Sequence, residues 1–244
     1  MNIPNSVTNI GNRVFSGCSS LTNINISGNI TSIGEGMFFD CTSLTSVIIP
    51  KSVTSINSNA FYNCSSLANV IIGDNVTSIG NTAFYECSSL TDITIPKNVT
   101  SIGEDAFSYC SSLKNVTIGD NIIDINYGAF SFCRSLEHIF IPDSVKNIGD
   151  YAFTRCSSLK EASIGKDIET IGKYSFHFCD SLTDLTLNDN IKTIGTYAFG
   201  FCLSLEAINY KGTKAQWRKI IKRSYWRAES PIKTIHCTDG DINL

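Results

Sequence analysis

Apolar residues recur along this chain with a period of 23 residues. Nine cysteines mark the period, and each has a phenylalanine three residues before it and a leucine three residues after it. The cysteines are Cys18, Cys41, Cys64, Cys87, Cys110, Cys133, Cys156, Cys179 and Cys202. Three columns that agree in nine successive copies establish an internal repeat of the kind that builds solenoids.

Each repeat combines a strand pattern with a turn pattern. The leucine opens an L-x-x-I-x-I segment, as at Leu90, Ile93 and Ile95, in which the last two apolar positions alternate as in a strand with one buried face. Further along, one column holds only glycine or asparagine, which predicts a corner with positive backbone φ. A small residue and the phenylalanine follow, such as Ala106 and Phe107. They predict one short helical turn before the chain bends at the cysteine.

Alternate repeats differ just after the strand segment. Proline stands there in one set of repeats and glycine in the other: Pro50, Pro96 and Pro142 against Gly73, Gly119 and Gly165. Because proline lacks a backbone donor and glycine is flexible, we expect alternate coils to leave the sheet by different turns.

A unit with a single inward apolar face cannot fold alone. Burying its apolar columns contributes roughly 10–20 kcal/mol, whereas ordering one unit costs about 35 kcal/mol. When units stack, each one buries apolar surface against the unit on either side and forms parallel-sheet hydrogen bonds with both. The sequence therefore predicts an α/β solenoid over residues 1–210, with about nine coils and an incomplete first coil. One parallel sheet of short strands is expected on one side, with turns and short helical turns on the other.

The unit L-x-x-I-x-I-P-x-x-V-x-x-I-G-x-x-A-F-x-x-C-x-S-L resembles the repeat of BspA-like leucine-rich repeat proteins, a class of surface proteins. The resemblance covers residues 1–210, and the segment from Tyr210 to Trp217 is similar to the end module of bacterial members. It implies a horseshoe-like leucine-rich repeat solenoid, a secreted or cell-surface location, and a role in adhesion or host contact.

Residues 211–244 are expected to cap the last coil. Thr213 and Gln216 form a T-x-x-Q capping box, and Trp217 begins an apolar face, so we predict a short helix over 213–222. The first coil is incomplete, and no signal peptide precedes it. We therefore expect the chain to be a fragment of a longer protein.

The composition gives little support for catalysis or for charged partners. The net charge of −3 offers no reason to expect a nucleic-acid partner. The sequence contains no run of 18 apolar residues, so we expect no membrane insertion. Cysteines one repeat apart would be slightly too distant and wrongly oriented for disulfides, so we expect buried free thiols. His138, His177 and His236 fall in different columns. The sequence therefore predicts no metal, no cofactor and no enzymatic activity.

Candidate binding residues lie where the repeat varies. The outward positions of the strands form the first set: Ile48, Asn69, Ile71, Asp92, Thr94, Asn115, Thr117, His138, Phe140 and Glu161. Apolar residues on this polar face favour a contact patch, although ordinary strand propensity also explains them. A second, weaker set is an aromatic stripe beside the cysteines: Phe39, Tyr62, Tyr85, Tyr109, Phe132, Phe178 and Phe201. These rings could grip a partner or wedge the bend between coils, and we favour wedging.

We expect a non-catalytic binding or adhesion module. Its partner would be a protein or glycan on a host or neighbouring cell, recognised through the solenoid surface. The alternative is a structural spacer or scaffold that presents other domains at a cell surface.

Overall fold

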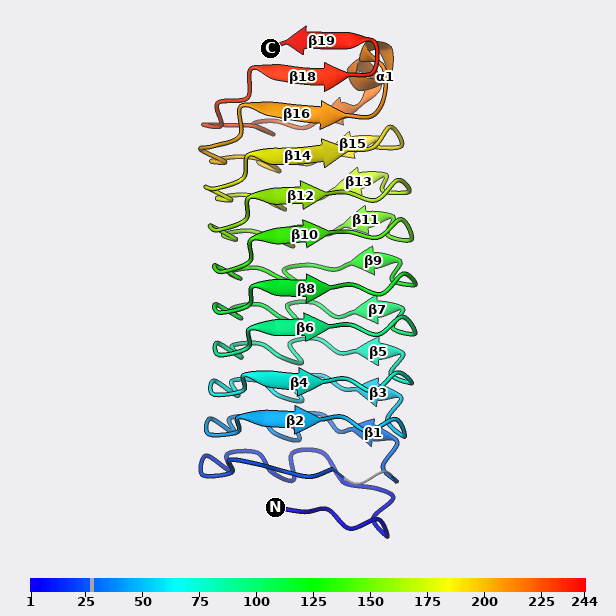
Figure 1. The fold of residues 1–244 in the computed structure, drawn as a ribbon, viewed down its shortest axis with the longest axis vertical. Coiled ribbons are helices and arrows are strands. Elements are labelled where there is room, and N and C mark those ends of the chain that lie inside the picture. Colours follow the sequence, from blue (N-terminus) through cyan, green and yellow to red (C-terminus); the bar gives the residue numbers. More distant parts are fainter. Residues whose placement is uncertain (27–28) are drawn as a thin grey trace.

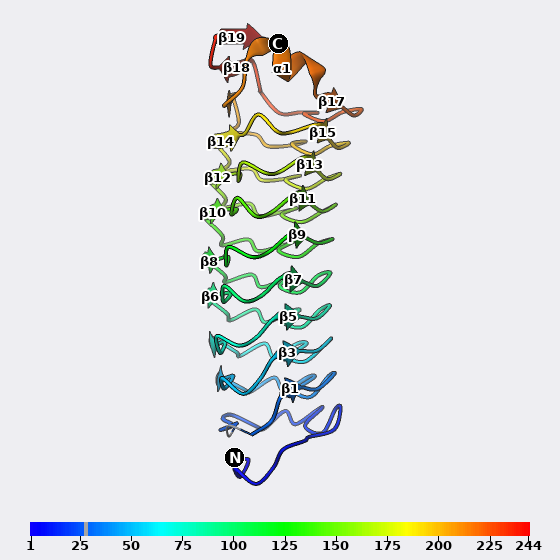
Figure 2. The same ribbon diagram turned by 90° about the vertical axis from the view of Figure 1, so that its right-hand side faces the viewer.

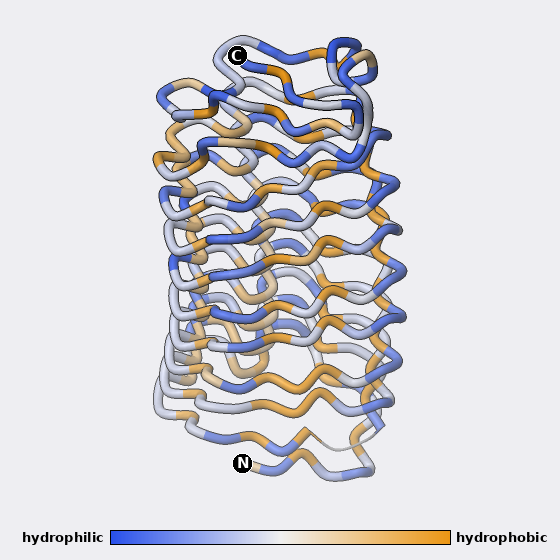
Figure 3. The backbone as a smooth tube through the Cα atoms, turned by 45° about the horizontal axis from the view of Figure 1, so that its top comes forward, coloured by the Kyte–Doolittle hydropathy of each residue, from blue (hydrophilic) through white to orange (hydrophobic). Residues whose placement is uncertain are grey.

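Successive repeats stack as coils of a nearly straight solenoid in the computed structural model, which describes residues 1–26 and 29–244 (Figure 1 and Figure 2). Apolar positions occupy the same place in each coil, so that they line up along the length of the molecule (Figure 3). The predicted solenoid is therefore confirmed. The coils stack with little of the curvature that the word horseshoe implies (Figure 2).

One side of the solenoid carries the strands of the L-x-x-I-x-I segments, and we call it the strand face. These strands are β2 (Ser46–Ile48), β4 (Asn69–Ile71), β6 (Asp92–Thr94), β8 (Asn115–Thr117), β10 (His138–Phe140), β12 (Glu161–Ser163), β14 (Asp184–Leu187), β16 (Ala207–Tyr210) and β18 (Thr234–Cys237). Paired strands from β2 to β16 are parallel and shifted by one repeat, so that Ile48 lies beside Ile71, and β18 also pairs with β16 in parallel. A final strand, β19 (Gly240–Asn243), runs antiparallel to β18.

A second parallel sheet lies on another side of each coil, where the sequence led us to expect turns and short helical turns. Its nine strands of two residues are β1 (Ser32–Ile33), β3 (Ser55–Ile56), β5 (Ser78–Ile79), β7 (Ser101–Ile102), β9 (Asp124–Ile125), β11 (Asn147–Ile148), β13 (Thr170–Ile171), β15 (Thr193–Ile194) and β17 (Ile221–Lys222). The segments around the phenylalanines form hydrogen-bonded turns. The fold thus has two ladders joined by turns, and the prediction of a single sheet was wrong.

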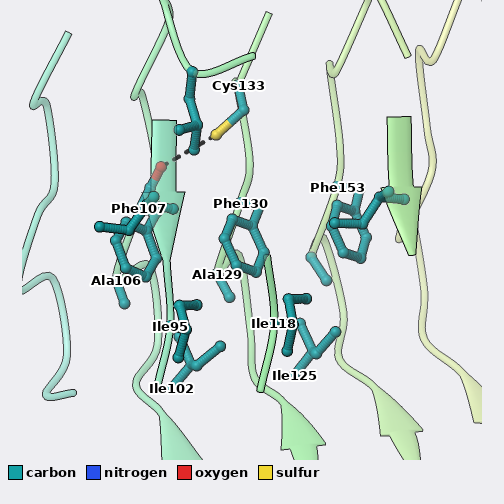
Figure 4. Close-up of a cluster of buried hydrophobic side chains, with 14 of the residues drawn as sticks. Ile95, Ile102, Ala106, Phe107, Ile118, Ile125, Ala129, Phe130, Cys133 and Phe153 are labelled. Carbon is teal, nitrogen blue, oxygen red and sulfur yellow. Dashed lines mark hydrogen bonds between the residues drawn. The ribbon is translucent and has the colours of Figure 1, made fainter. Parts of the chain in front are cut away.

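The core is a set of parallel side-chain columns between the two sheets. The rings of Phe107, Phe130 and Phe153 stack with centroids 5.4 and 5.5 Å apart, and all three are fully buried (Figure 4). The thiol of Cys133 donates to the carbonyl oxygen of Phe107 in the preceding coil at 3.3 Å. The buried thiol thus has a hydrogen-bond acceptor without forming a disulfide. All ten cysteines are free.

The glycine column has a different cause from the one predicted. Gly103 does not have positive φ. A Cβ atom on Gly103 would instead lie 2.4 Å from the backbone nitrogen of Asn81 in the preceding coil, so glycine is required by the close approach of stacked backbones. Positive φ falls further on, at Asp105 (52°) and Tyr109 (60°). The backbone N–H groups of both residues donate to the next coil at 2.8 Å, which holds them in this uncommon conformation.

The C-terminal segment extends both ladders by one more strand each, because β17 pairs with β15 and β18 pairs with β16. The helix α1 (Lys214–Lys219) is shorter than the expected 213–222 and has the capping box of Thr213 and Gln216. The helix ends before β17, which extends the second ladder. Its residue Trp217 is buried. No helix among the described residues is long and apolar enough to cross a membrane.

Candidate functional site

The strand face is interrupted twice. β2 pairs with β4, β6 pairs with β8, and β10 to β18 form one ladder with β19, but within the described chain no pairing joins β4 to β6 or β8 to β10. Figure 1 shows wider spacing at these two steps. The second ladder and the phenylalanine column run past both steps without a break. The coils therefore separate on the strand face alone.

Backbone hydrogen bonds identify what is missing at the first interruption. Between the paired strands β2 and β4, Ile49 N donates to Ile71 O at 2.8 Å. The equivalent bond is present where the strands pair elsewhere, for example from Ile95 N to Thr117 O between β6 and β8. The equivalent bond from Ile72 N to Thr94 O is absent in residues 1–26 and 29–244. Both walls of this gap thus carry backbone groups that the fold leaves unpaired.

Proline is the feature that the two open steps share. Pro96 follows β6, directly above the coil that contains Gly73, and Pro142 occupies the same position at the second interruption. In both open steps, a coil with glycine after its strand is followed by a coil with proline at that position. The next coil with glycine, at Gly165, is followed by a coil with Asn188 in place of proline, and there β12 pairs with β14. The proline ring is bulky and has no N–H, so it favours an open step.

A cleft of about 570 Å³ lies at the first interruption. It is lined by Asn69, Val70, Ile71, Ile72, Asp74, Asp92, Ile93, Thr94 and Pro96. Val70 in its wall is 9% exposed, against 2% for Val47 in the strand below, so the open step slightly increases the exposure of this core side chain. Four of the predicted strand-face residues, Asn69, Ile71, Asp92 and Thr94, thus meet in one cleft.

The rim of the cleft is apolar on one side and acidic on the other. Ile48 and Ile71 lie in register on adjacent strands and are 62% and 60% exposed. Asp92 accepts a hydrogen bond from the Asn115 side chain at 2.5 Å, and this bond lowers the pKa of Asp92. Asp74 is also exposed at the cleft. The arrangement offers an apolar contact beside two carboxylates, one of which, Asp74, lies 3.9 Å from the Lys51 ammonium group.

The other predicted strand-face residues lie above the cleft. Thr117 on β8 pairs with Thr94. His138, Phe140 and Glu161 lie beyond the second interruption, where His138 Nδ1 is 3.3 Å from a Glu161 carboxylate oxygen and Phe140 is 63% exposed. The structure therefore places four residues of the predicted set in the cleft and three on β10 and β12, while Ile48, Asn115 and Thr117 lie on the neighbouring strands β2 and β8.

The aromatic stripe consists of stacked, half-buried rings. Phe39, Tyr62 and Tyr85 stack with centroids 4.7 and 4.9 Å apart, and Tyr109 and Phe132 continue the column at 4.3 Å after a tilted step. Burial raises the pKa of Tyr85 to about 12. Phe178 and Phe201 stack at 4.8 Å further along. These contacts join each coil to the next.

Sequence reasoning missed the residue that completes this stripe. Arg155 stands between Phe132 and Phe178, with its guanidinium carbon 5.6 and 4.5 Å from the two ring centroids. Its column position, directly before a core cysteine, was available as a signal, because aromatic residues flank it one repeat before and after. A further ladder of stacked tyrosines was also missed: Tyr151, Tyr174, Tyr197 and Tyr225.

The histidines and the possible metal ligands are scattered over the part of the chain that the structure describes. They contain no group of three or more histidine, cysteine, aspartate or glutamate side chains that could hold a metal ion. His177 is half-buried among aromatic rings, and burial, followed by the charge of Arg155, lowers its pKa to about 4. His138 and His236 each lie beside one carboxylate oxygen, at 3.3 and 2.9 Å.

Comparison with known proteins identifies the repeat class. The family model described as the BspA type leucine-rich repeat region matches residues 1–114 and 100–222. A leucine-rich repeat protein from Bacteroides ovatus is 29% identical with a TM-score of 0.84, and the match covers 98% of this chain and 63% of that protein. This chain thus spans less than two thirds of that relative's length.

Two other solved structures share the fold. The leucine-rich repeat protein of T. pallidum is 27% identical with a TM-score of 0.61, over 65% of this chain and 76% of that one. A leucine-rich repeat protein from Eubacterium ventriosum is 20% identical with a TM-score of 0.50, over 91% and 87%. None of the curated proteins matches the chain.

Proposed function

Because the chain belongs to the BspA-type leucine-rich repeat family, whose members usually serve as protein-interaction or surface modules, we propose that it is a non-catalytic binding module. It holds an extended segment of a protein partner at the cleft between β4 and β6. The observation that carries this proposal is the open step itself, which combines unpaired backbone groups with exposed apolar side chains.

The backbone supports an extended peptide as the occupant. A peptide carries one N–H donor and one C=O acceptor per residue. A whole strand cannot enter this gap, because Cα atoms of β4 and β6 lie within 8 Å of one another, whereas an inserted strand needs roughly 9.6 Å. An extended segment that lies over the cleft can direct some of its polar groups into it. The Ile72 N–H and the Thr94 C=O have no partner on the opposite wall in the described part of the chain. A bound segment would satisfy these groups, which the fold otherwise leaves to water.

The side chains of the cleft indicate which peptides would fit. Val70 and Ile71 offer apolar contact for one apolar side chain of the segment. Asp74 and Asp92 lie at the rim and favour lysine or arginine beside that apolar residue. The proposed partner therefore presents an extended, basic and apolar segment.

The proposed setting is a cell surface or the extracellular medium, where the module would mediate adhesion to a host or neighbouring cell. This part rests on the family, because BspA-like proteins are a class of surface proteins.

Selection of short random peptides displayed on phage tests the proposal. The selected peptides should share an apolar residue flanked by lysine or arginine, and Ile71→Ser should weaken their binding about tenfold through lost apolar burial. Leu203→Ser is the matched control, because Leu203 is equally exposed, at 60%, and lies outside the cleft. Equal binding by the two variants, or selected peptides without a common pattern, would contradict the proposal.

A structural spacer is the second candidate, favoured by the straight form of the solenoid and its continuous core. A spacer needs length and stiffness but no partner on the strand face. Failure of the peptide selection, together with a rod of constant length in solution scattering, would favour the spacer.

A further inference from the structure

A second hollow lies away from the cleft, where the loops before β10, β12 and β14 stack on one another. It has a volume of about 270 Å³ and is lined by Arg134, Arg155, Ser157, Phe178 and Asp180. These residues occupy the positions directly before and after the core cysteines in three successive coils. Two positive charges and one carboxyl group thus surround a space smaller than a typical drug-sized pocket, which is about 300–1,000 Å³.

The guanidinium of Arg155 is held in place by the aromatic stripe. It lies over the rings of Phe132 and Phe178, and the Arg155 backbone N–H donates to His177 O at 2.7 Å. Arg134 lies over the same Phe132 ring at 5.9 Å. The donors of a guanidinium lie in its plane, so packing over its faces leaves those donors free at the edge.

The polar groups of the hollow lack partners within the protein. No described residue forms a salt bridge or a side-chain hydrogen bond with the guanidinium of Arg134 or Arg155. One carboxylate oxygen of Asp180 is buried and unpaired, and burial raises the pKa of this carboxyl group. Unpaired polar groups in a partly enclosed space are costly, and a ligand that supplies both an anion and a donor would satisfy them together.

We propose that this hollow binds the carboxylate of an acidic sugar, a uronic acid residue within a glycan. The arginine pair would hold the carboxylate through paired N–H donors, and a ring hydroxyl would donate to the unpaired oxygen of Asp180. The faces of the Phe178 ring are covered by Arg155 and Phe201, so Phe178 offers the sugar only an apolar contact at the edge of its ring. This glycan site goes beyond the proposed protein partner and lies on a different surface.

The charge balance favours a singly charged sugar over other anions. Asp180 would repel a phosphate group, which carries a charge of about −1.5 to −2, more strongly than a carboxylate, whereas a sulfate ester carries the same single charge as a carboxylate. A glutamate side chain of a peptide carries the same charge but must lose rotamer freedom on binding. A rigid sugar ring presents the carboxylate and a neighbouring hydroxyl without that loss.

Titration calorimetry of the full chain with a short oligomer of galacturonic acid tests this proposal. We expect binding at millimolar concentration or below, and none of the matched galactose oligomer. Arg134→Gln should weaken binding about tenfold, because a charged hydrogen bond is lost. Arg155→Lys keeps the charge but loses the planar fork and should also weaken binding, with an unchanged circular dichroism spectrum. Arg223→Gln removes an equivalent exposed charge outside the hollow and should have no effect.

Three results would overturn the proposal. The unsubstituted chain could fail to bind galacturonate at millimolar concentration. Arg134→Gln could bind as tightly as the unsubstituted chain, or Arg223→Gln could weaken binding equally, which would indicate a general charge effect. Finally, a sulfated galactose oligomer or a polyglutamate peptide could bind as tightly as galacturonate, which would assign the hollow to another class of anion.

Discussion

Replacing Pro96 by asparagine should close the cleft between β4 and β6. Asn188 already occupies the equivalent turn at a step that is fully paired, so the substitution copies an arrangement that the fold accepts. Closure would form about four backbone hydrogen bonds, each contributing about 0.5–1.5 kcal/mol. Asparagine leaves the unfolded chain more flexible than proline does, and this offsets about 0.4–1 kcal/mol of the stabilisation. The net stabilisation should therefore be about 1–5.6 kcal/mol.

Amide hydrogen exchange measures this closure directly. In the unsubstituted chain the Ile72 amide should exchange quickly, because it has no acceptor, whereas the Ile49 amide is protected by its bond to Ile71 O. Pro96→Asn should slow exchange at Ile72 and raise the melting temperature by roughly 2–4 °C per kcal/mol for a chain of this size. Unchanged exchange at Ile72 would refute the argument that proline holds the step open.

The reverse substitution is the matched control. Asn188→Pro should open the step between β12 and β14, because the asparagine side chain no longer bonds to Ile164 O and the bulky ring takes its place. The backbone bond from Ile164 N to Thr186 O, now 3.2 Å long, should be lost, and the Ile164 amide should exchange faster. Retention of protection at Ile164 would show that proline alone does not cause the interruptions.

Three further predictions concern the core and its titratable groups. Phe130→Ala should cost about 3–5 kcal/mol in the free energy of unfolding, because it leaves a cavity between two stacked rings, and denaturant unfolding will measure the loss. The pKa of His177 is lowered from 6.5 to about 4, so the unfolded state binds the proton first, and stability should fall as pH drops from 6.5 towards 4. His177 is only half-buried, so the loss should be at most about 2 kcal/mol, and it should vanish in His177→Gln when melts at the two pH values are compared. Iodoacetamide should modify Cys18 and Cys237 in the folded chain and the remaining cysteines only after unfolding, as peptide mass spectrometry can show.

Most of the fold could be predicted because its repeated columns carry one physical requirement each. The spacing of the phenylalanines and cysteines gives the coil length, and the alternation at Ile93 and Ile95 gives the strand. The second ladder was not predicted, because a strand of two residues is too short to show alternation. The role of Gly103 was also misassigned, since the contact that excludes a side chain there is with the preceding coil.

The candidate site could be predicted only in part. Outward positions such as Ile71 follow from strand alternation, and the structure places Ile71 beside Asp92 at the cleft. The cleft itself depends on whether neighbouring coils pair, which is a property of two repeats together. The difference between Pro96 and Asn188 was visible in the sequence, but its effect on pairing became clear only in the stacked coils.

The two interruptions also make the interfaces between coils unequal in energy. A repeat protein unfolds approximately as a one-dimensional chain of units coupled to their nearest neighbours, and weak couplings are where such a chain divides. Under a pulling force the solenoid should therefore lose pairs of coils as blocks bounded by Pro96 and Pro142, starting away from the continuous ladder of β10 to β18. Each block of two repeats would lengthen the chain by about 150–165 Å, at about 3.3–3.6 Å per residue. The alternation of proline and glycine after the strands would then define the mechanical subunits of the molecule.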